Sequence, residues 1–462
     1  MVWLAHDETG PPVRQNIASL RYLITRMFLS HLLILLLLTG GVTSVPTPPG
    51  KKIGTLQVSN ASAVGLTQKA VRLGRKVLGL APNTRLYPVL LDETGQLIPA
   101  QLDDTDADGQ WDELFWVMDI PAKTSRKLMV QLVDTLPVYP NQVRVRFGKR
   151  SSAYTPVRPL TEDTFYAHEL PIRQGYQPYQ TDGPTWENDK VGFRHYFDGR
   201  NAKDLFGKRS PALSPDSVGL TPTRAVVDNY HVLRDWGRDV LPVGNAEGLS
   251  LGLGGVGLQI GNELYRVGVM ATDSVHTVES SRLRVLASGP VRAALELDHR
   301  NWKPRPDRDY RLVEQPTIWP GMYAYQNTVQ VHNLQGDETL LIGLPRVATP
   351  KSVEQLQTDD WVALFTHDKQ SYNREHWLGL AIVVPRSLFE GVGEAPAKGP
   401  VALSYYARLN ARAGKPLTYY ALGSWELSDP GFRDPAYFRE YLRQFMQQIA
   451  QPVAVKMIPN SP

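Results

Sequence analysis

The chain has 462 residues, of which 42% are hydrophobic and 21% are charged, and its formal net charge is +4. This composition is typical of a folded globular protein with two large domains, or two plus a small one, and is too apolar for a disordered chain. Basic residues are scattered among nearly as many acidic ones, which argues against a nucleic-acid-binding protein, because that function needs a clustered basic face. The lack of cysteine excludes disulfides, thiolate metal sites and a cysteine nucleophile.

The first 44 residues have the layout of a secretory signal. An apolar run at residues 27–38 follows two arginines and precedes the small, turn-prone residues 39–44. Because the run is too short to cross a bilayer comfortably, we expect residues 1–44 to be cleaved, the protein to be secreted or periplasmic, and no stable membrane span to remain. A single membrane anchor is the alternative. The residues before Met27 are atypical of a signal, which leaves Met27 open as the true start of translation.

Residues 45–135 are expected to form a small β-sandwich, because short β-rich segments alternate there with Gly, Pro, Asn and Asp. Within this region, the run DDTDADGQWDE at residues 103–113 resembles a calcium-binding loop, with carboxylates at loop positions 1, 3, 5 and 9 and glycine at position 6. Position 12 is Phe115, so the usual bidentate glutamate is missing unless Glu113 substitutes for it. We expect a structural Ca²⁺ distant from any chemistry, and an Asp-rich surface turn is the alternative. The candidate ligands are Asp104, Asp106, Asp108, Asp112 and Glu113.

Residues 136–223 are expected to form a connection that carries a functional loop. The run GPTWENDKVGFRHYFDGRNAKDLFGK at residues 183–208 mixes acidic, basic, aromatic and amide side chains with a single imidazole. It shows no alternation of apolar and polar residues, so neither a packed strand nor an amphipathic helix accounts for it. We therefore expect an ordered loop held by a rigid scaffold.

Residues 224–452 contain many long β-rich runs at hairpin spacing and few helical segments, which predicts a large two-sheet antiparallel sandwich. Only the end is helical in pattern. Asp434 and Pro435 provide an N-cap and a first-turn proline, apolar residues recur at helical spacing, and Pro452 ends the pattern. The fold class is therefore expected to be mainly β, with an N-terminal sandwich, a larger sandwich and a C-terminal helix.

A second polar run, DNYHVLRDWGRDV at residues 228–240, opens the large domain. The sequence has no Gly-x-x-x-x-Gly-Lys-Ser/Thr phosphate loop and no His-Glu-x-x-His, so P-loop nucleotide chemistry and zinc-protease chemistry are not indicated. Tryptophan and tyrosine beside carboxylates, amides and arginine suit a carbohydrate site, because aromatic rings cover the apolar face of a sugar while polar groups bind its hydroxyls. Arginine would also grip a uronate carboxylate through two hydrogen bonds.

Twelve residues of the two polar runs are candidates for this site, and each has a structural alternative. The charged residues can form salt bridges that stabilise a loop, the histidines can be satisfied by backbone partners, and the tryptophans can be partly buried anchors. The candidate catalytic residues are His231, His195, Tyr196, Tyr230 and Arg194. The candidate substrate-binding residues are Trp186, Glu187, Asn188, Lys190, Asp235, Trp236 and Arg238.

Together with three shorter runs, these polar runs resemble the secreted bacterial proteins of the domain-of-unknown-function family 4861. Members of that family are associated with polysaccharide-utilisation systems. The resemblance implies a β-sandwich followed by a β-supersandwich like that of galactose mutarotase and several polysaccharide lyases. At least one similar protein is an oligosaccharide dehydratase, which removes water from a non-reducing-end uronic acid and leaves a 4,5-unsaturated sugar. The resemblance covers residues 53–451 and is carried by GPTWENDKVGFRHYFDGRNAKDLFGK, YHVLRDWGRDVLPVG with SLGLGG, SGPVRAALEL and WELSDPGF.

The leading hypothesis is therefore a secreted lyase or dehydratase whose partner is a uronic-acid-containing oligosaccharide. β-Elimination from a uronate needs three groups: a cation that neutralises the carboxylate, a base for the C5 proton and an acid for the departing hydroxyl. We expect no cofactor for this chemistry. The candidates for the three roles are, in order, Arg194 or Arg238 with Asn188, His231 or His195, and Tyr196 or Tyr230.

Three alternatives stay open from the sequence. A glycoside hydrolase on the same scaffold would use two carboxylates, such as Glu187 and Asp235. A non-catalytic glycan-binding protein would use the same aromatic and polar groups without reaction. An epimerase or mutarotase is also compatible, because a fold does not determine a function.

Overall fold

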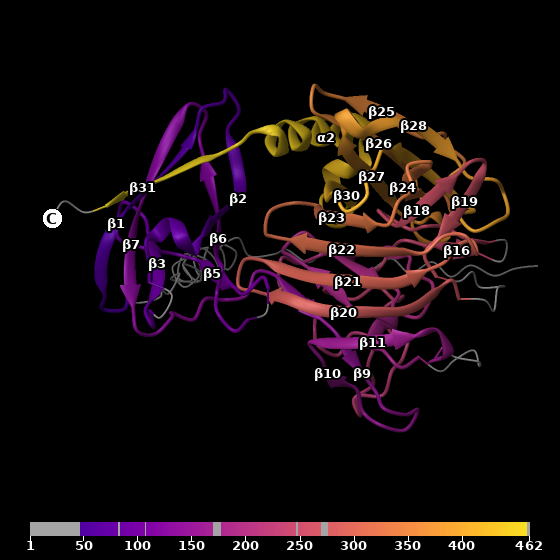
Figure 1. Cartoon of the computed structure of the whole chain (residues 1–462), viewed down its shortest axis with the longest axis horizontal. Coiled ribbons are helices and arrows are strands. Elements are labelled where there is room, and N and C mark those ends of the chain that lie inside the picture. Colours follow the sequence, from indigo (N-terminus) through magenta and orange to yellow (C-terminus); the bar gives the residue numbers. More distant parts are fainter. Residues whose placement is uncertain are drawn as a thin grey trace, which may run out of the picture. The chain divides into compact units, whose positions relative to one another are not determined.

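The computed structural model describes residues 47–81, 84–106, 108–169, 177–245, 248–268 and 276–459. Strands make up 48% of the structure and helices 9%, which confirms the prediction of a mainly β protein with one helix near the C-terminus (Figure 1). The expected signal at residues 1–44 lies outside the described residues. Within the described ranges, no helix combines the length and the apolar character that crossing a membrane requires.

The N-terminal sandwich packs two antiparallel sheets over a core that includes Leu56, Leu90, Trp116 and Val130. Its first strand alternates buried and partly exposed residues, as a strand with one solvated face does. The five-stranded sheet consists, in spatial order, of β31 (Ala454–Pro459), β1 (Lys51–Asn60), β7 (Thr124–Val133), β3 (Tyr87–Leu91) and β4 (Leu97–Ile98). The three-stranded sheet consists of β2 (Leu66–Gly74), β6 (Glu113–Ile120) and β5 (Ala100–Asp103).

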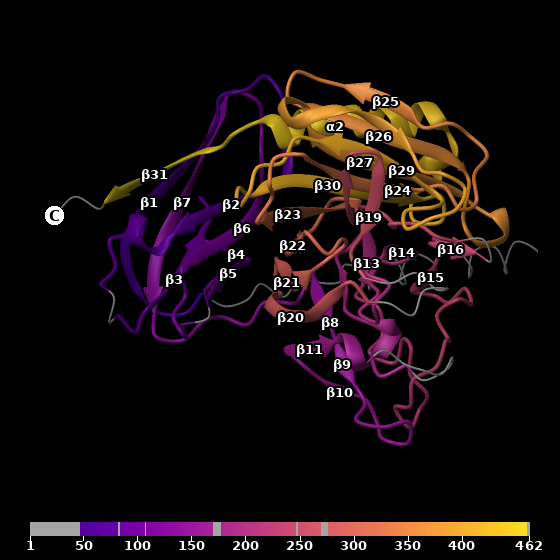
Figure 2. The ribbon, with the colours of Figure 1, turned by 45° about the vertical axis from the view of Figure 1, so that its right-hand side comes forward.

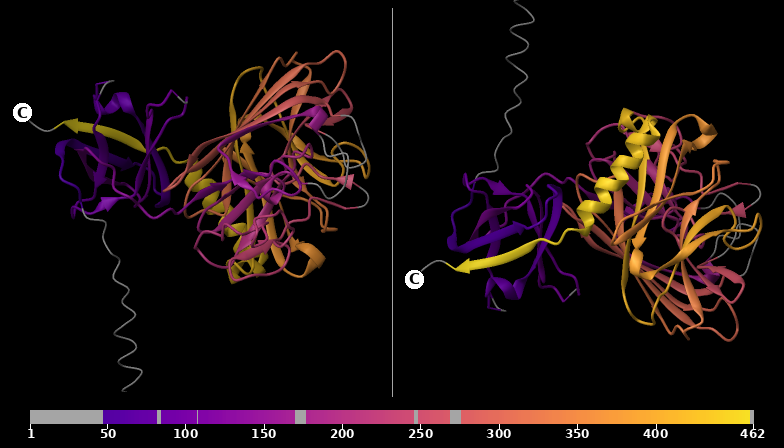
Figure 3. Two further views of the ribbon diagram at one scale, coloured as in Figure 1. Left: turned by 90° about the horizontal axis from the view of Figure 1, so that it is seen from below. Right: turned by 90° about the horizontal axis from the view of Figure 1, so that it is seen from above.

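Strand β31 comes from the far end of the chain and completes the N-terminal sandwich. It pairs antiparallel with β1, with Gly54 opposite Pro459 and Ser59 opposite Ala454, and the two strands can be followed together in both views of Figure 3. The sequence patterns did not indicate this strand. The N-terminal sandwich is therefore built from both ends of the described chain.

The large domain is organised around one antiparallel sheet of nine strands. Its two faces are covered by different elements: on β30, the Tyr419 hydroxyl donates to Gly254 O, whereas the next residue, Tyr420, packs against Phe445 of the C-terminal helix. In spatial order the strands are β11 (Glu162–Tyr166), β20 (Val278–Ser288), β21 (Ala293–Trp302), β22 (Tyr310–Ile318), β23 (Ala324–His332), β30 (Leu417–Trp425), β27 (Trp377–Pro385), β26 (Trp361–Lys369) and β25 (Glu354–Gln357).

Two five-stranded sheets pack against this large sheet and enclose the main hydrophobic core with it. The first consists of β19 (Glu263–Arg266), β18 (Val256–Ile260), β24 (Glu338–Pro345), β29 (Ser404–Leu409) and β28 (Phe389–Glu394). The second, part of which is labelled in Figure 2, consists of β15 (Gly237–Asp239), β14 (Lys203–Lys208), β13 (Val191–His195), β12 (Thr185–Glu187) and β8 (Arg144–Arg146).

Short elements complete the described chain. Two two-stranded ladders are formed by β9 (Gly148–Lys149) with β10 (Arg158–Pro159) and by β16 (Gly244–Asn245) with β17 (Gly248–Leu249). The 3₁₀ turns are η1 (Arg75–Leu78), η2 (Ala167–Glu169), η3 (Gln180–Asp182), η4 (Tyr372–Arg374), η5 (Arg386–Leu388) and η6 (Pro430–Arg433).

The expectation of a loop at residues 183–208 is wrong, because the structure has three strands there: β12, β13 and β14. Every residue of these strands is buried. A strand that is covered on both faces shows no alternation of apolar and polar residues. In this protein several of the covered positions carry charges, which removed the remaining sequence signal for a strand.

The C-terminal helix α2 (Pro435–Ala450) begins where the sequence indicates. The Asp434 side chain accepts a hydrogen bond from Ala436 N at 2.8 Å, and Pro435 occupies the first turn. One face of the helix is buried and packs against the outside of the nine-stranded sheet. The buried residues are Phe438, Leu442, Phe445 and Met446.

Candidate active site

The hairpin of β13 and β14 presents a polar pair on each of its faces. Arg194 lies opposite Asp204 in the ladder, and His195 lies opposite Lys203. Because neighbouring residues of a strand point to opposite sides, these pairs enter two separate clusters. We call the cluster of Arg194, Tyr196, Asp204, Asp239 and His231 the outer network. The inner network consists of His195, Asn201, Lys203, His299, Glu314 and Asn327, and faces the nine-stranded sheet.

The outer network is centred on a fully buried guanidinium. Arg194 Nε donates to Asp204 Oδ1 at 3.0 Å, and its Nη2 donates to Asp239 Oδ2 at 2.7 Å and to the Tyr196 hydroxyl at 2.6 Å. The Tyr196 hydroxyl in turn donates to Asp204 Oδ2 at 3.0 Å. Two carboxylates thus share one cation, and burial together with the negative charge of Asp204 raises the pKa of Asp239 well above its usual range.

The outer network reaches solvent through His231. Its Nδ1 lies 3.7 Å from Asp239 Oδ2, and 43% of its side chain is exposed. The imidazole stands edge-on to the ring of Tyr372, with ring centroids 5.4 Å apart. Partial burial and the nearby Arg194 lower the pKa of His231, so the ring is neutral at neutral pH and can accept a proton. His231 is thus an accessible imidazole beside a buried carboxyl group, which makes it a candidate general base.

Asp182, a buried acidic residue on strained backbone, lies beside the outer network. Thr181 and Asp182 adopt left-handed backbone angles, with φ of 52° and 60°, a conformation that costs energy in residues with a β-carbon and is often found at functional sites. Asp182 Oδ2 lies 3.1 Å from Arg200 Nη2, whereas its buried Oδ1 has no hydrogen-bond partner in the described part of the chain. Burial raises the pKa of Asp182 to about 6.

An open hollow of about 730 Å³ adjoins the loop that carries His231. This volume lies within the range of ligand-binding cavities. The indole of Trp236 lies at the hollow and packs on Phe206, with centroids 6.1 Å apart, and Phe206 in turn lies 5.1 Å from the Arg194 guanidinium carbon. Trp236 and Phe206 therefore lie between the hollow and Arg194, and no residue of the outer network lines the hollow itself. Its polar lining residues include Ser210, Asn229, Arg234 and Asp235.

Two of the predicted substrate-binding residues, Trp186 and Glu187, are buried in β12. The Trp186 ring packs on Phe193 and Tyr325 and belongs to the main core. Glu187 accepts hydrogen bonds from Arg144, Lys208 and Ser214. Although burial acts in the opposite direction, these cations and hydrogen bonds lower its pKa to about 2. Glu187 is therefore held as an ionised structural carboxylate.

Asn188 and Lys190 also lie away from the outer network. The Asn188 amide donates to Trp319 O and Met322 O, at 2.7 and 2.8 Å, and its oxygen accepts from the backbone N of Lys190 and Val191. This side chain fastens the turn between β12 and β13 to the large sheet. Lys190 lies 3.5 Å from Asp189 at the surface.

The inner network contains the other predicted histidine. His195 Nε2 lies 3.1 Å from Asn201 Oδ1, and burial lowers its pKa well below the usual range. Lys203 Nζ donates to Glu314 Oε2 at 2.7 Å. Asn327 donates to the same carboxylate oxygen at 2.8 Å. These residues are closed off from solvent, so His195 and His231 belong to different environments.

Two residues of the candidate site were not selected from the sequence. Tyr372 lies in η4 between β26 and β27, where the following residues Asn373 and Arg374 both have left-handed φ angles. The polar run SYNREH at residues 371–376, between two apolar strands, was the signal that could have identified it. Arg234 belongs to the polar run at residues 228–240 but is not among the candidate residues, because its place in the hollow depends on the fold of the loop.

Three of the five candidate calcium ligands lie close together. Asp104, Asp106 and Asp108 bring one carboxylate oxygen each to within 4.8 Å of the others. Asp112 instead accepts hydrogen bonds from the backbone and hydroxyl of Thr105. Glu113 lies 2.6 Å from Arg292 Nη1 and does not join the group of three aspartates. Three carboxylates fit the oxygen preference of Ca²⁺, and binding of the ion stays a prediction.

A sequence model of the family described as "Domain of unknown function (DUF4861)" matches residues 58–455. A curated relative, "Uncharacterized protein P7" from Formosa agariphila, is 23% identical over 294 residues, which cover 61% of this chain and 69% of the relative.

Two solved structures from Enterococcus faecalis are similar to this chain at low identity. A protein in glycosyl hydrolase family 38 gives a TM-score of 0.43 at 10% identity over 87% of this chain. An α-mannosidase gives 0.45 at 9% identity over 90% of this chain. The chain spans 47% of the length of each.

Proposed function

The chain belongs to the family described as domain of unknown function DUF4861, and from this membership and the outer network we propose that it is a carbohydrate-active lyase or dehydratase. Its substrate is a uronic-acid-containing oligosaccharide, as the resemblance to an oligosaccharide dehydratase implies. The observation that carries the proposal is the position of His231: the exposed imidazole lies 3.7 Å from the buried carboxylate of Asp239.

In this mechanism His231 is the base. Its Nδ1 faces Asp239, which leaves Nε2 to accept the C5 proton of the uronate. The imidazolium that forms lies beside Asp239, which accepts a hydrogen bond from Arg194. The electrons of the C5–H bond form the C4–C5 double bond while the C4–O bond breaks. The departing hydroxyl takes a proton and leaves as water.

The other two roles fall to groups outside the buried ion-pair cluster of Arg194, Asp204 and Asp239. Arg194 is buried and fully engaged, so we assign carboxylate neutralisation to Arg234 in the hollow and to Arg238, whose side chain is 10% exposed and lies 2.8 Å from Glu375. Tyr196 and Tyr230 are buried. Tyr372, which contacts His231, is therefore the phenol that protonates the leaving group.

The ultraviolet absorbance of the unsaturated product tests this proposal. The wild-type protein is expected to raise absorbance at the enol-ether band with at least one member of a panel of saturated uronic oligosaccharides. His231→Gln is expected to lower kcat by about 10²- to 10⁴-fold, the usual contribution of a general base. His168→Gln, at an exposed histidine elsewhere, is the control and is expected to keep the wild-type rate.

Other products would select other functions. New reducing ends without the chromophore would indicate a hydrolase, although Glu187 is engaged by two cations and a serine. Binding with an unchanged sugar mass would indicate a glycan-binding protein. An unchanged rate in His231→Gln would remove this residue from the mechanism.

A further inference from the structure

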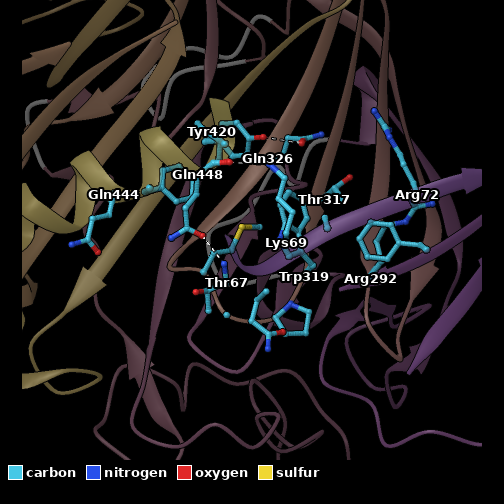
Figure 4. A pocket seen from close by; sticks show the side chains of 18 of the residues that line it. Thr67, Lys69, Arg72, Arg292, Thr317, Trp319, Gln326, Tyr420, Gln444 and Gln448 are labelled. Carbon is cyan, nitrogen blue, oxygen red and sulfur yellow. Dashed lines mark hydrogen bonds between the residues drawn. The ribbon is translucent and has the colours of Figure 1, made fainter. Parts of the chain in front are cut away.

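A second cavity of about 440 Å³ lies between the N-terminal sandwich and the large domain, away from the outer network (Figure 4). Strand β2 forms one wall, the last turns of α2 form another, and the connection between β22 and β23 closes the floor. None of its lining residues belongs to the outer network or to the hollow beside His231. Its volume is sufficient for a single sugar residue with its neighbours outside.

Contacts between the elements hold the walls of this cavity in place. Thr67 N donates to the Gln448 side chain at 3.1 Å, and Lys69 Nζ donates to Gln448 O at 2.9 Å. The register of β2 is irregular between Leu66 and Lys69, where Gln68 has a φ of 47°. Gln68 also packs on Gly321, where an added β-carbon would lie 2.6 Å from Gln68 Cγ. The cavity is therefore formed where two sheets and a helix meet, and direct contacts between these elements fix its walls.

All the charged side chains that line the cavity are positively charged. Lys69, Arg72 and Arg292 line the cavity, and no aspartate or glutamate does. Arg292 forms ion pairs with Asp103 and Glu113, neither of which lines the cavity. Lys69 and Arg72, in contrast, form no ion pair with any residue that the structure describes. Burial lowers the pKa of Lys69 to about 8, which is the behaviour of a cation without a counter-charge.

The rest of the lining suits a sugar. Trp319, Tyr420 and Tyr441 supply aromatic surface, and the amides of Gln326, Gln444 and Gln448 supply donors and acceptors for hydroxyl groups. Aromatic faces cover the apolar side of a sugar ring, while amides and cations bind its polar edge. A neutral sugar would leave Lys69 and Arg72 unpaired, whereas an anionic sugar would pair with them.

We propose that this cavity is a second saccharide-binding site, which holds one anionic sugar residue of a chain whose other residues extend into solvent. The anionic group is a uronate carboxylate or a sulfate ester, since both offer anionic oxygens, and neither Lys69 nor Arg72 has an anionic partner in the described part of the chain. The site binds and does not react, because no carboxylate or imidazole lines it. It goes beyond the proposed function, since binding here needs no turnover.

Calorimetry on the whole chain tests this site directly. The probes are trigalacturonate, a sulfated galactan trisaccharide and neutral maltotriose. Trigalacturonate, the sulfated trisaccharide or both are expected to bind, and maltotriose at least tenfold more weakly. The double variant Lys69→Gln, Arg72→Gln is expected to weaken anionic binding at least tenfold. Its matched control, Arg126→Gln with Lys127→Gln, removes the same two charges from exposed positions of strand β7, in the other sheet of the N-terminal sandwich, and is expected to bind as the wild type does.

A second pair of variants covers the case in which the double variant fails to fold. Gln444→Glu places a negative charge at the rim of the cavity, while Gln447→Glu adds the same charge to the same helix without lining it. Gln444→Glu is expected to weaken binding of the anionic probe about tenfold, and Gln447→Glu to leave it unchanged.

Equal binding by all variants, or equal binding of neutral and anionic probes, would overturn the inference. His231→Gln separates the two proposals. If it still binds trigalacturonate in a manner that depends on Lys69 and Arg72, the second site stands whether or not the elimination reaction is found.

Discussion

The two faces of the β13–β14 hairpin carry similar side chains in different surroundings. In the outer network His231 Nδ1 lies 3.7 Å from Asp239, and in the inner network His299 Nε2 lies 3.8 Å from Glu314. The first imidazole is 43% exposed, whereas the second is closed off by the large sheet. The distance between imidazole and carboxyl group is thus nearly the same in both networks, and access to solvent is what differs between them.

Charge balance separates the two networks as well. Within the inner network one lysine, Lys203, faces one glutamate, Glu314, and burial keeps the pKa of His299 at about 4. The outer network sets two carboxylates, Asp204 and Asp239, against one arginine. In the inner network each charge has one opposite charge, which favours fixed ionisation states. In the outer network the second carboxyl group lacks a cation of its own, so it can take part in proton transfer with the nearby imidazole.

The largest expected effect concerns stability, where the two faces should behave alike. Arg194→Met leaves Asp204 and Asp239 buried without their cation, so we expect a loss of about 3–5 kcal/mol in the free energy of unfolding. Lys203→Met on the inner face leaves Glu314 in the same position, and the loss should be similar. Urea denaturation measures both. Arg209→Met, at an exposed arginine, is the control and should change stability by less than about 0.5 kcal/mol. A loss below about 1 kcal/mol in Arg194→Met would contradict the burial of the ion pairs that Arg194 forms with Asp204 and Asp239.

The second effect is the pH dependence that Asp182 adds on the outer side. Its pKa is raised from 3.8 to about 6, so the folded protein binds this proton more tightly than the unfolded chain does. The contribution to stability is fully present below pH 3.8 and is lost as the pH rises through about 6, by at most about 3 kcal/mol. Denaturation curves between these pH values should show the decline. Asp182→Asn should flatten it, and an unchanged slope would place the titrating group elsewhere.

The alternating strands and the helix were predictable because their patterns follow from one covered face. Asp434 and Pro435 marked the start of α2, and the fold class follows from many strands at hairpin spacing. The strands at residues 185–208 were not predictable, because they are covered on both faces and carry buried charges. Strand β31 was missed because its burial pattern, mostly exposed and partly buried, gives no strong apolar signal.

The candidate site was predictable in composition and not in arrangement. The two polar runs do meet, through the contact of Arg194 with Asp239. Arg194 and His195 face different networks because they are neighbours in a strand, and the sequence did not indicate that strand. Tyr372 lies about 140 residues further along the chain, and only the tertiary fold brings it to His231.

The third prediction tests whether the hollow beside Trp236 binds the substrate. Arg234→Gln removes a guanidinium from the hollow without touching the buried network, so KM for a uronic substrate should rise about tenfold while kcat changes little. Arg209→Gln is the matched control, since this exposed arginine does not line the hollow. A fall in kcat with unchanged KM would instead mean that Arg234 acts in the transition state.

The smallest expected effect bears most directly on the comparison. His195→Gln keeps a hydrogen-bonding group near Asn201 in the inner network, so we expect a loss of stability of about 1 kcal/mol and a change in kcat of less than about threefold. Steady-state rates and thermal unfolding on the same preparation separate the two quantities. Because His195 follows Arg194 in the same strand, a merely local disturbance of β13 would affect both faces. If His195→Gln abolished the rate with the fold intact while His231→Gln did not, the inner face would be the catalytic one.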